Sequence, residues 1–414
     1  MLTAISRYGA RVAPETDDIL RRCERTGTLI EGPHIREFES AFARRLGQRD
    51  VVATSYGRMA FYYLLKALDV PPGSEIAIPA LTFWVIPELA RVAGLKPLFV
   101  DVDPETFTMD PRALERTITD KTRAVVPTHL YGLPCDMDAI EPIARRHDLR
   151  IIEDCAHALG ATARGRPVGT LGDAALFSLQ TLKPLNTFGG GVAVARDPAV
   201  LARVRALADS EPWPDQQRIN RRLLVGRLQR LFIKPRVFTF TAFPILWAAS
   251  WGHWNPDVYL WEPIRILDPL PDSYRERYPN VQAAVGLAGL KYLDDWTART
   301  VRHARRLLDA LARVPGVHVP EVPHDRTHVY YQCCAYVGDR DAFVLRAIRR
   351  GIDVETLHVD VCPDLDIFAE YKVPAPGAQH ANQAVQLPAY AALSDRQVDM
   401  IVRRVARPVA GSPA

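Results

Sequence analysis

The feature that most constrains this chain is a regular alternation of short apolar runs with amphipathic helical patterns. Strand-like runs lie at residues 51–55, 75–80, 96–103, 123–129, 149–154, 173–179 and 190–195, and helical patterns lie at 30–47, 59–68, 85–93, 111–118 and 136–147. Buried strands that alternate with helices are typical of a mostly parallel sheet with helices on both faces. The sequence therefore predicts a large α/β domain.

The second half of the chain predicts a smaller domain. A long helical pattern begins at about residue 281, and a strand at 328–337, a helix at 341–350 and a last helix from about 394 follow it. We expect a large α/β domain at 1–280 with an insertion at about 212–268. We expect residues 281–414 to form a linking helix and a small α+β domain. The length of 414 residues is enough for such a division.

Composition excludes several classes of protein. The net charge of +4 is small for 414 residues and predicts no nucleic-acid partner. The six cysteines form no C-x-x-C pair, and the first residues lack the apolar core of a signal peptide. No uncharged apolar run reaches 18 residues. We therefore expect a cytoplasmic protein with reduced thiols.

Three reactive side chains are predicted to meet at one edge of the sheet. Asp154 ends the strand at 149–154, Ser178 lies near the end of the strand at 173–179, and Lys183 follows before a run of three glycines. In open α/β sheets, ligands bind at the carboxyl ends of the strands. Among the seven lysines, only Lys183 follows such a strand and precedes a glycine run.

This set suits pyridoxal phosphate. A lysine forms the Schiff base with its aldehyde, and an aspartate keeps its pyridine nitrogen protonated, so that the ring acts as an electron sink. Hydroxyl groups and the N–H groups at the start of a helix hold its phosphate. Two plainer interpretations stay open: Lys183 as a surface lysine beside a hairpin, and Asp154 as the N-cap of a helix.

The chain resembles the DegT/DnrJ/EryC1/StrS family of pyridoxal-phosphate sugar aminotransferases, which have the aspartate-aminotransferase fold (fold type I). The resemblance runs from about Gly32 to Val402 and is broken by one insertion. It rests on GPHIREFESAFARRLG, IPALTF, KPLFVDVDPETFTMDP, VVPTHLYGLPCDMDAI, IIEDCAHALGA, GTLGDAALFSLQTLKPLNTFGGG and NVQAAVGLAGLKYLD in this order.

The resemblance implies a role for each matching residue. Lys183 would form the Schiff base and carry protons, and Asp154 would bind the pyridine nitrogen. His157 would lie near the phenolic oxygen of the cofactor, and Phe83 would stack on its ring; for both, plain core packing is the alternative. The phosphate would be bound by Ser178 and by N–H groups around Gly57, Arg58 and Met59.

Three positions depart from the family pattern. Arg58 and Met59 replace a pair of small residues, so Arg58 is a candidate ligand of the phosphate or the substrate. Pro184 stands after the lysine, where the family has Asn. Arg275 replaces an Asn that reaches the phosphate of the neighbouring subunit, and the family's shared active sites imply a homodimer.

The implied reaction is a transamination in two halves, with pyridoxamine phosphate between them. The expected donor is L-glutamate, and the acceptor is a keto-sugar that is linked to a nucleotide or to a lipid. The alternatives are dehydration or carbon–carbon chemistry with the same cofactor, and a non-catalytic scaffold attached to membrane. Lys183 favours the aminotransferase, because a dehydratase branch of the family has His at this position.

The insertion at 212–268 is the most individual part of the chain. It contains five of the seven tryptophans, and its basic residues precede an apolar run at 237–251 that Pro244 interrupts. This run is too short to span a membrane. Basic residues beside Trp and Phe are typical of a segment lying in a membrane surface, here within 223–261 at the inner face. An arm at a subunit interface and a lid over the substrate stay open.

Other candidates are weaker. We expect no metal ion: His358, Asp360 and Cys362 form a short cluster that favours the edge of a substrate site. Three aromatic side chains of the small domain could contribute to substrate binding or could merely pack, namely His328, Tyr330 and Tyr331.

Overall fold

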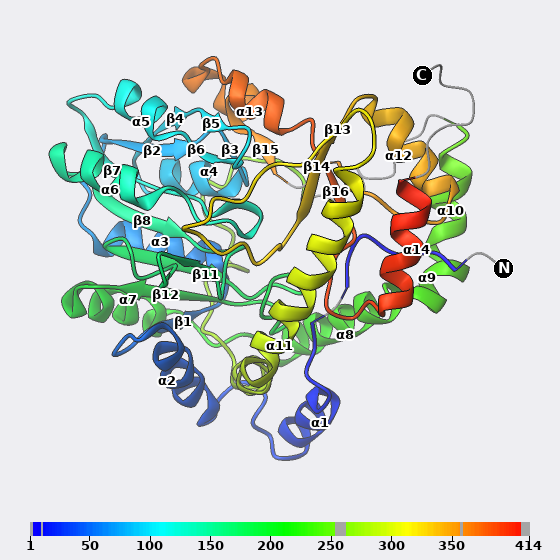
Figure 1. The fold of residues 1–414 in the computed structure, drawn as a ribbon. Coiled ribbons are helices and arrows are strands. Elements are labelled where there is room, and N and C mark those ends of the chain that lie inside the picture. The colour runs from blue at the N-terminus through cyan, green and yellow to red at the C-terminus, as the bar shows by residue number, and fades with distance from the viewer. Residues whose placement is uncertain (1–2, 10, 253–261, 357–358, 407–414) are drawn as a thin grey trace.

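The computed structural model describes residues 3–9, 11–252, 262–356 and 359–406. Its centre is a seven-stranded sheet with the order β1-β12-β11-β8-β7-β2-β4 (Figure 1). The four pairs from β11 to β4 are parallel, and β12 runs antiparallel to β11 and β1. The predicted mostly parallel α/β sheet is confirmed. Its strands are β1 (Val52–Thr54), β2 (Glu75–Pro79), β4 (Lys96–Val100), β7 (Thr122–Val125), β8 (Arg150–Asp154), β11 (Ala174–Ser178) and β12 (Gly191–Ala195).

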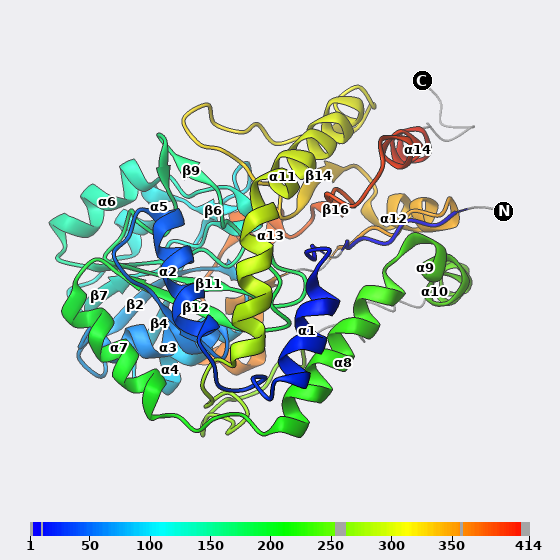
Figure 2. The same cartoon turned by 90° about the horizontal axis from the view of Figure 1, so that it is seen from below.

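Helices cover both faces of this sheet because its strands are apolar on both sides. In β11, Leu176 packs in one hydrophobic cluster, whereas its neighbours Ala175 and Phe177 pack in another on the opposite face. The first face carries α3 (Gly57–Ala67), α4 (Val85–Val92) and α7 (Pro198–Ser210). The second carries α2 (His34–Leu46), α5 (Pro111–Thr117), α6 (Met137–Arg146) and the first half of α11 (Asn280–Leu311) (Figure 2).

The second half of α11 belongs to a smaller layer. It packs on a three-stranded sheet of β13 (Val317–His318), β14 (Cys333–Val337) and β16 (Val385–Leu387), with α12 (Arg340–Arg349) and α14 (Asp395–Val405). Two pairings cross the predicted division at 280/281: Ile5 with Ile352, and β3 (Leu81–Thr82) with β15 (Asp360–Val361). The division therefore stays a prediction.

The predicted strand at 328–337 is wrong in its first half, because only β14 is a strand. The preceding residues bond instead to the turn after β7, where Val329 N–H donates to the carbonyl of Gly132 and Gln332 N–H to that of Tyr131. Tyr330 has a φ of 49°. This loop brings Tyr331 to the edge of the large sheet.

The N-terminal segment ties three parts of the chain together. Ala4 N–H donates to Thr239 Oγ1 at 2.9 Å, and Arg7 forms a buried ion pair with Asp353 at 2.6 Å. The segment then leads into α1 (Thr16–Arg25), which packs on α11.

The insertion is helical, which the sequence analysis did not predict. It forms α8 (Gln216–Phe232), α9 (Pro235–Phe240) and α10 (Ala242–Ala249). The chain leaves helical geometry at Thr241, so the apolar run at 237–251 is divided between two short helices. Within the described residues, no helix is long and apolar enough to cross a membrane.

The remaining elements are short and connect the main ones. They are β5 (Val102–Asp103), β6 (Thr108–Met109), η1 (Leu130–Gly132), β9 (Thr162–Ala163), β10 (Arg166–Pro167), η3 (Cys362–Asp364), η4 (Asp366–Tyr371) and α13 (Pro376–Ala381).

Candidate active site

The carboxyl ends of β8 and β11 bring Asp154 and Ser178 to the same edge. The two strands are parallel neighbours, with Leu176 opposite Asp154. Lys183 follows β11 in a turn that its own N–H closes on the carbonyl of Gln180 at 2.9 Å. The predicted acid, hydroxyl and amine are therefore neighbours of one sheet edge.

Burial and charge set the protonation of Lys183 and Asp154. Burial lowers the pKa of Lys183 to about 7; Asp154 opposes this shift, and the charge of Arg58 adds to it. Burial also raises the pKa of Asp154, while the Ala156 N–H, Lys183 and His129 oppose that shift. A lysine with a pKa near 7 can give and take a proton at neutral pH.

Aromatic rings line one side of the lysine. The Nζ atom of Lys183 lies 4.8 Å from the centre of the Tyr331 ring. His157 stacks on Tyr331 with 4.2 Å between ring centres, and its other neighbour is Tyr131 at 6.4 Å. Nδ1 of His157 accepts a hydrogen bond from the Tyr131 N–H. The imidazole is thus held in a stack within reach of the lysine.

The start of α3 lies beside Ser178. No side chain caps this helix, so the N–H groups of its first turn point outward without a side-chain acceptor. A Cβ on Gly57 would lie 3.0 Å from Cβ of Ser178 and 3.1 Å from the carbonyl oxygen of Phe177, so a larger residue would crowd Ser178. The N–H of Met59 already donates to the carbonyl of Tyr56, which leaves Gly57 and Arg58 as the nearer donors.

These residues fit pyridoxal phosphate. The uncapped start of α3 with Ser178 matches a phosphate, the carboxylate of Asp154 matches a protonated ring nitrogen, and the amine of Lys183 matches an aldehyde. The ring of Phe83 is half-buried beside this edge and packs against Trp84 with 6.0 Å between centres.

Arg58 has a partner that the sequence analysis missed. Its guanidinium group forms two hydrogen bonds of 2.7 Å with both carboxylate oxygens of Glu262, and Nη1 donates to the hydroxyl of Tyr274 at 2.5 Å. The same group lies 5.8 Å from the centre of the Phe83 ring. Glu262 lies near the end of the insertion at 212–268, so this segment reaches the edge of the site.

Arg275 contacts Glu211 and not the group around Lys183. Its Nε atom donates to a carboxylate oxygen of Glu211 at 3.3 Å, and 54% of its side chain is exposed. Arg275 does not meet the other predicted cofactor residues of its own subunit.

Arg11 is a second residue that the sequence analysis missed. It is 8% exposed, and Nη2 donates to Thr300 Oγ1 at 3.2 Å, while Nη1 has no hydrogen-bond partner within the described residues. Burial lowers its pKa to about 10, and its electrostatic neighbour is Tyr331. No local pattern marks this residue, because Thr300 and Tyr331 are far from it in sequence.

The other predicted candidates lie outside this group. His358 is outside the described residues. Asp360 is in β15, where burial raises its pKa to about 6, and the Cys362 thiol donates to the carbonyl of Thr82. His328 stacks on Tyr330 with 4.0 Å between ring centres, and burial lowers its pKa to about 3. Of the three small-domain aromatics, Tyr331 is the one that contacts Lys183.

A buried group of His129, Glu153 and Cys155 has the side chains of a metal site. The Glu153 carboxylate, however, accepts N–H groups from Gly169, Leu171 and Gly172 and also contacts Nε2 of His129 at 2.9 Å. These hydrogen bonds connect β8, just before Asp154, to the turn at 169–172 and to His129.

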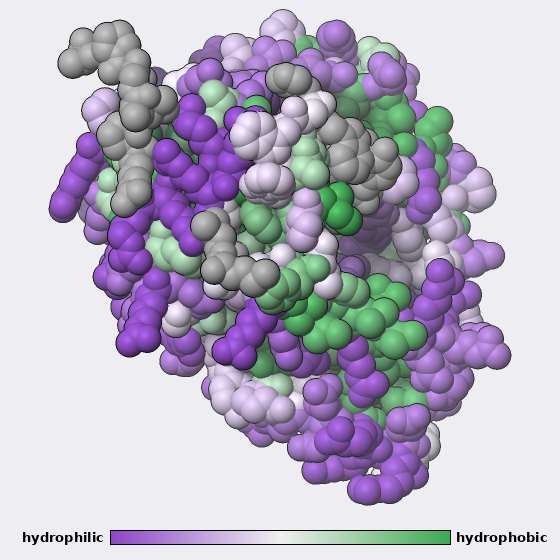
Figure 3. Space-filling model, turned by 90° about the vertical axis from the view of Figure 1, so that its right-hand side faces the viewer, coloured by the Kyte–Doolittle hydropathy of each residue, from purple (hydrophilic) through white to green (hydrophobic). Residues whose placement is uncertain are grey.

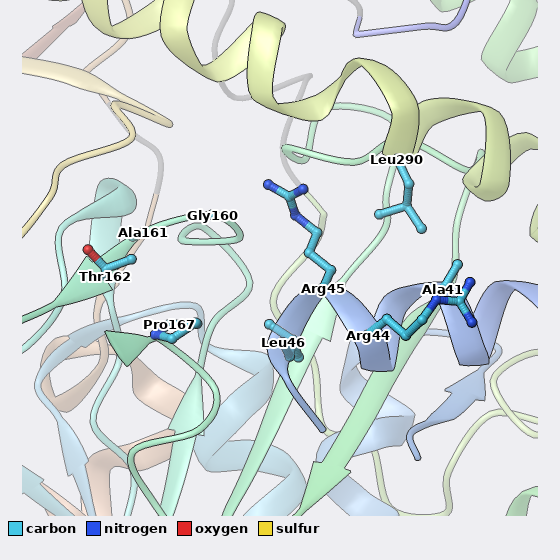
Figure 4. A pocket seen from close by; sticks show the side chains of 9 residues that line it. All are labelled: Ala41, Arg44, Arg45, Leu46, Gly160, Ala161, Thr162, Pro167 and Leu290. Carbon is cyan, nitrogen blue, oxygen red and sulfur yellow. The ribbon is translucent and has the colours of Figure 1, made fainter. Parts of the chain in front are cut away.

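A surface pocket between α2 and the turn after β8 lies away from Lys183. Figure 4 shows Arg44 and Arg45 rising from α2 and Leu290 from α11. It contains none of the predicted site residues; its lining is Ala41, Arg44, Arg45, Leu46, Gly160, Ala161, Thr162, Pro167 and Leu290.

The fold and the site define a pyridoxal-phosphate-dependent aminotransferase. The sequence profile of the DegT/DnrJ/EryC1/StrS aminotransferase family matches residues 11–231 and 272–406. The chain belongs to this family, and the predicted family, cofactor and enzyme class are confirmed. The unmatched residues 232–271 contain α9 and α10.

Relatives cover nearly the whole chain. GDP-perosamine synthase of Caulobacter vibrioides is 30% identical over 94% of this chain and 93% of its own. UDP-N-acetyl-3-dehydro-alpha-D-glucosamine 3-aminotransferase of Acidithiobacillus ferrooxidans is 28% identical over 97% and 96%. The crystal structure of AtS13 from Actinomadura melliaura matches with a TM-score of 0.78, 26% identity and coverage of 97% and 98%.

Proposed function

We propose that this enzyme transfers the amino group of L-glutamate to a keto-sugar carried on a nucleoside diphosphate. The observation that carries the proposal is the position of Lys183, between Asp154 and the Tyr331 ring, with a pKa near 7. The names of the two relatives support the acceptor class, since one is a GDP-sugar enzyme and the other acts on a UDP-linked dehydro-sugar.

The cofactor would be held by residues at the sheet edge. Asp154 would hold the proton of the pyridine nitrogen, and Ser178 with the N–H groups of Gly57 and Arg58 would bind the phosphate. Phe83 would cover one face of the ring, and His157 would lie at its phenolic oxygen. Met59 would support the first turn of α3 from the hydrophobic core, where its side chain is fully buried.

Proton transfer falls to Lys183. When bound, pyridoxal phosphate supplies an electron sink for the charge that develops at the α carbon of the donor. Because burial lowers the pKa of Lys183 to about 7, the neutral form of Nζ is accessible at pH 7 and would accept the proton from that carbon. The stacked His157 and Tyr331 restrict how far this amine can move.

Arg11 supports an amino acid as donor. Its Nη1 atom is buried without a partner among the described residues, close to Tyr331. A buried guanidinium group of this kind gains most from a carboxylate, which it can bind through charged hydrogen bonds. We therefore assign Arg11 to a carboxylate of glutamate.

A lipid-linked keto-sugar is the second candidate for the acceptor. The observation that favours it is the exposed apolar surface of α8 to α10, whose chain continues to Glu262 beside Arg58. On this view the enzyme works from the cytoplasm at the inner face of the membrane. We also propose a homodimer, in which the half-exposed Arg275 reaches the phosphate of the partner subunit.

The test is an absorbance spectrum of the purified protein between 300 and 500 nm, before and after L-glutamate is added. We expect a visible band that glutamate shifts to shorter wavelength, and no such band in Lys183→Ala. The glutamate-treated enzyme is then mixed with nucleotide-linked and lipid-linked keto-sugars, and the amino-sugar is measured by mass spectrometry. A band that glutamate leaves unchanged contradicts the proposed donor.

A further inference from the structure

The outer side of α8, α9 and α10 is unusually apolar. Among the residues that the structure describes, twelve large apolar side chains are exposed, and nine of these lie between Leu224 and Trp251. Figure 3 shows hydrophobic side chains gathered into patches among hydrophilic ones on the side where α9 and α10 lie in Figure 1. Patches of this kind in soluble folds mark interaction surfaces.

Helix α8 has two apolar faces. The inner one, with Ile219 and Leu223, packs against Phe188 and Val281 in a buried cluster. On the outer one, Leu224, Leu228 and Leu231 recur at helical spacing and are 56%, 43% and 44% exposed. The outer residues are thus not needed to hold the helix in place.

The two short helices are anchored in the same way. Phe238 and Phe243 point inward and pack against Ala4 and Ile348. At the end of α10, Arg349 donates to the carbonyl of Ser250 at 2.6 Å, and its guanidinium group lies 4.0 Å from the Trp251 ring centre. These contacts hold the two helices in place, although three large side chains in or just after them stay exposed: Phe240 (63%), Trp247 (44%) and Trp251 (60%).

The helices that carry this apolar surface contribute cations and no acidic residues. Residues 216–252 contain seven Lys and Arg residues and no Asp or Glu. Four of the seven have acidic neighbours, namely Glu276 or Asp17. Arg221, Lys234 and Arg236 are exposed and have no acidic partner within the described part of the chain.

The charge pattern decides between two occupants. A second copy would meet this surface through the same surface, as in a two-fold dimer, and would bring two sets of these cations into one interface. Such like-charge contacts are unfavourable. A layer of anionic lipid headgroups instead complements the cations, while its acyl region accepts the Leu, Phe and Trp side chains.

We propose that the outer side of α8 to α10 is a binding face for anionic lipid membranes. The three helices lie along the bilayer surface, with Lys234 and Arg236 at the phosphate level and Phe240, Trp247 and Trp251 among the upper acyl carbons. This attachment is independent of the amino-transfer reaction and of whether the acceptor carries a lipid.

The test is co-sedimentation of the full chain with phosphatidylcholine vesicles, with and without phosphatidylglycerol. We expect binding to the anionic vesicles only, and weaker binding as salt rises. Each cation near an anionic surface contributes about fivefold to the affinity, so Lys234→Gln with Arg236→Gln weakens binding roughly 25-fold. Phe240→Ser with Trp247→Ser weakens it by at least about tenfold.

A matched control removes the same charges elsewhere. Arg112 and Lys121 are exposed at the edge of the large domain, away from α8 to α10. We expect Lys121→Gln with Arg112→Gln to leave vesicle binding unchanged. Quenching of tryptophan fluorescence by brominated lipid reports insertion directly, and circular dichroism checks that each variant is folded. The proposal is overturned if the natural chain does not bind vesicles or binds neutral vesicles equally well. It is also overturned if light scattering shows a lower molar mass for Phe240→Ser with Trp247→Ser than for the natural chain, because the face then belongs to a contact with a second copy.

Discussion

Lys183 and Lys234 place the same side chain in opposite environments in two regions of this enzyme. Lys183 lies beside Asp154 and Tyr331, where burial lowers its pKa to about 7. Lys234 stands exposed between α8 and α9, among other cations and exposed apolar side chains. Burial makes an amine a proton carrier, whereas exposure leaves it as a fixed positive charge.

The largest expected effect is the loss of turnover when Lys183, but not Lys234, is replaced by alanine. Lys183→Ala lowers the rate of amino transfer by about 10³-fold or more, because the amine proposed to carry the proton is lost. Lys234→Ala is its matched control and leaves the rate with a soluble acceptor within about twofold. The measurement is steady-state turnover with glutamate. A similar loss in both variants would break the comparison.

Asp154→Asn is expected to lower the rate by about 10²-fold to 10³-fold, because a neutral amide cannot stabilise a positive charge on the ring nitrogen. The exposed Asp120→Asn is the control, since Asp120 lies in a surface turn. Turnover and the visible spectrum are measured together. A variant with normal turnover would show that the buried acid is structural.

The pH dependence should shift in opposite directions for the two members of one ion pair. The charge of Arg58 lowers the pKa of Lys183, so Arg58→Gln raises that pKa, and the acid limb of the rate profile moves to higher pH. Glu262→Gln leaves Arg58 uncompensated and moves the limb to lower pH. Each shift is less than about one unit. Shifts in the same direction would refute this electrostatic account.

The smallest effect compares the two faces of α8. Leu228→Ser, on the outer face, changes the free energy of unfolding by less than about 0.5 kcal/mol. Leu223→Ala, on the inner face, lowers it by about 2 kcal/mol or more, because the residue is 6% exposed and packs in a cluster. Chemical denaturation measures both. An equal loss in both variants would mean that the outer face stabilises the fold.

The fold was largely predictable because its strands and helices show as short apolar runs and helical spacing within single stretches of the sequence. The runs that end at Asp154 and at Ser178 predict β8 and β11, and parallel strands bring their ends together whatever lies between them. Helix α7 was missed although Asp197 caps it and Pro198 begins it, which is a local signal.

Contacts between distant segments could not be predicted in this way. Glu262 lies 204 residues from Arg58, and Thr300 lies 289 residues from Arg11, so neither pairing has a sequence signature. The helices of the insertion were missed because α8 is apolar on two faces, so no single apolar stripe with helical spacing stands out from its sequence.

The N-terminal segment acts as a tether with both ends fixed. Its first hydrogen bond is to Thr239 in α9, its middle is clamped to Asp353, and its far end is Arg11 next to Tyr331. Any displacement of α9 must therefore either break the bond at Ala4 or pull on the chain that leads to Arg11. A displacement on the outside of the enzyme is thus linked, through two non-covalent contacts and the short chain between them, to the ring beside Lys183.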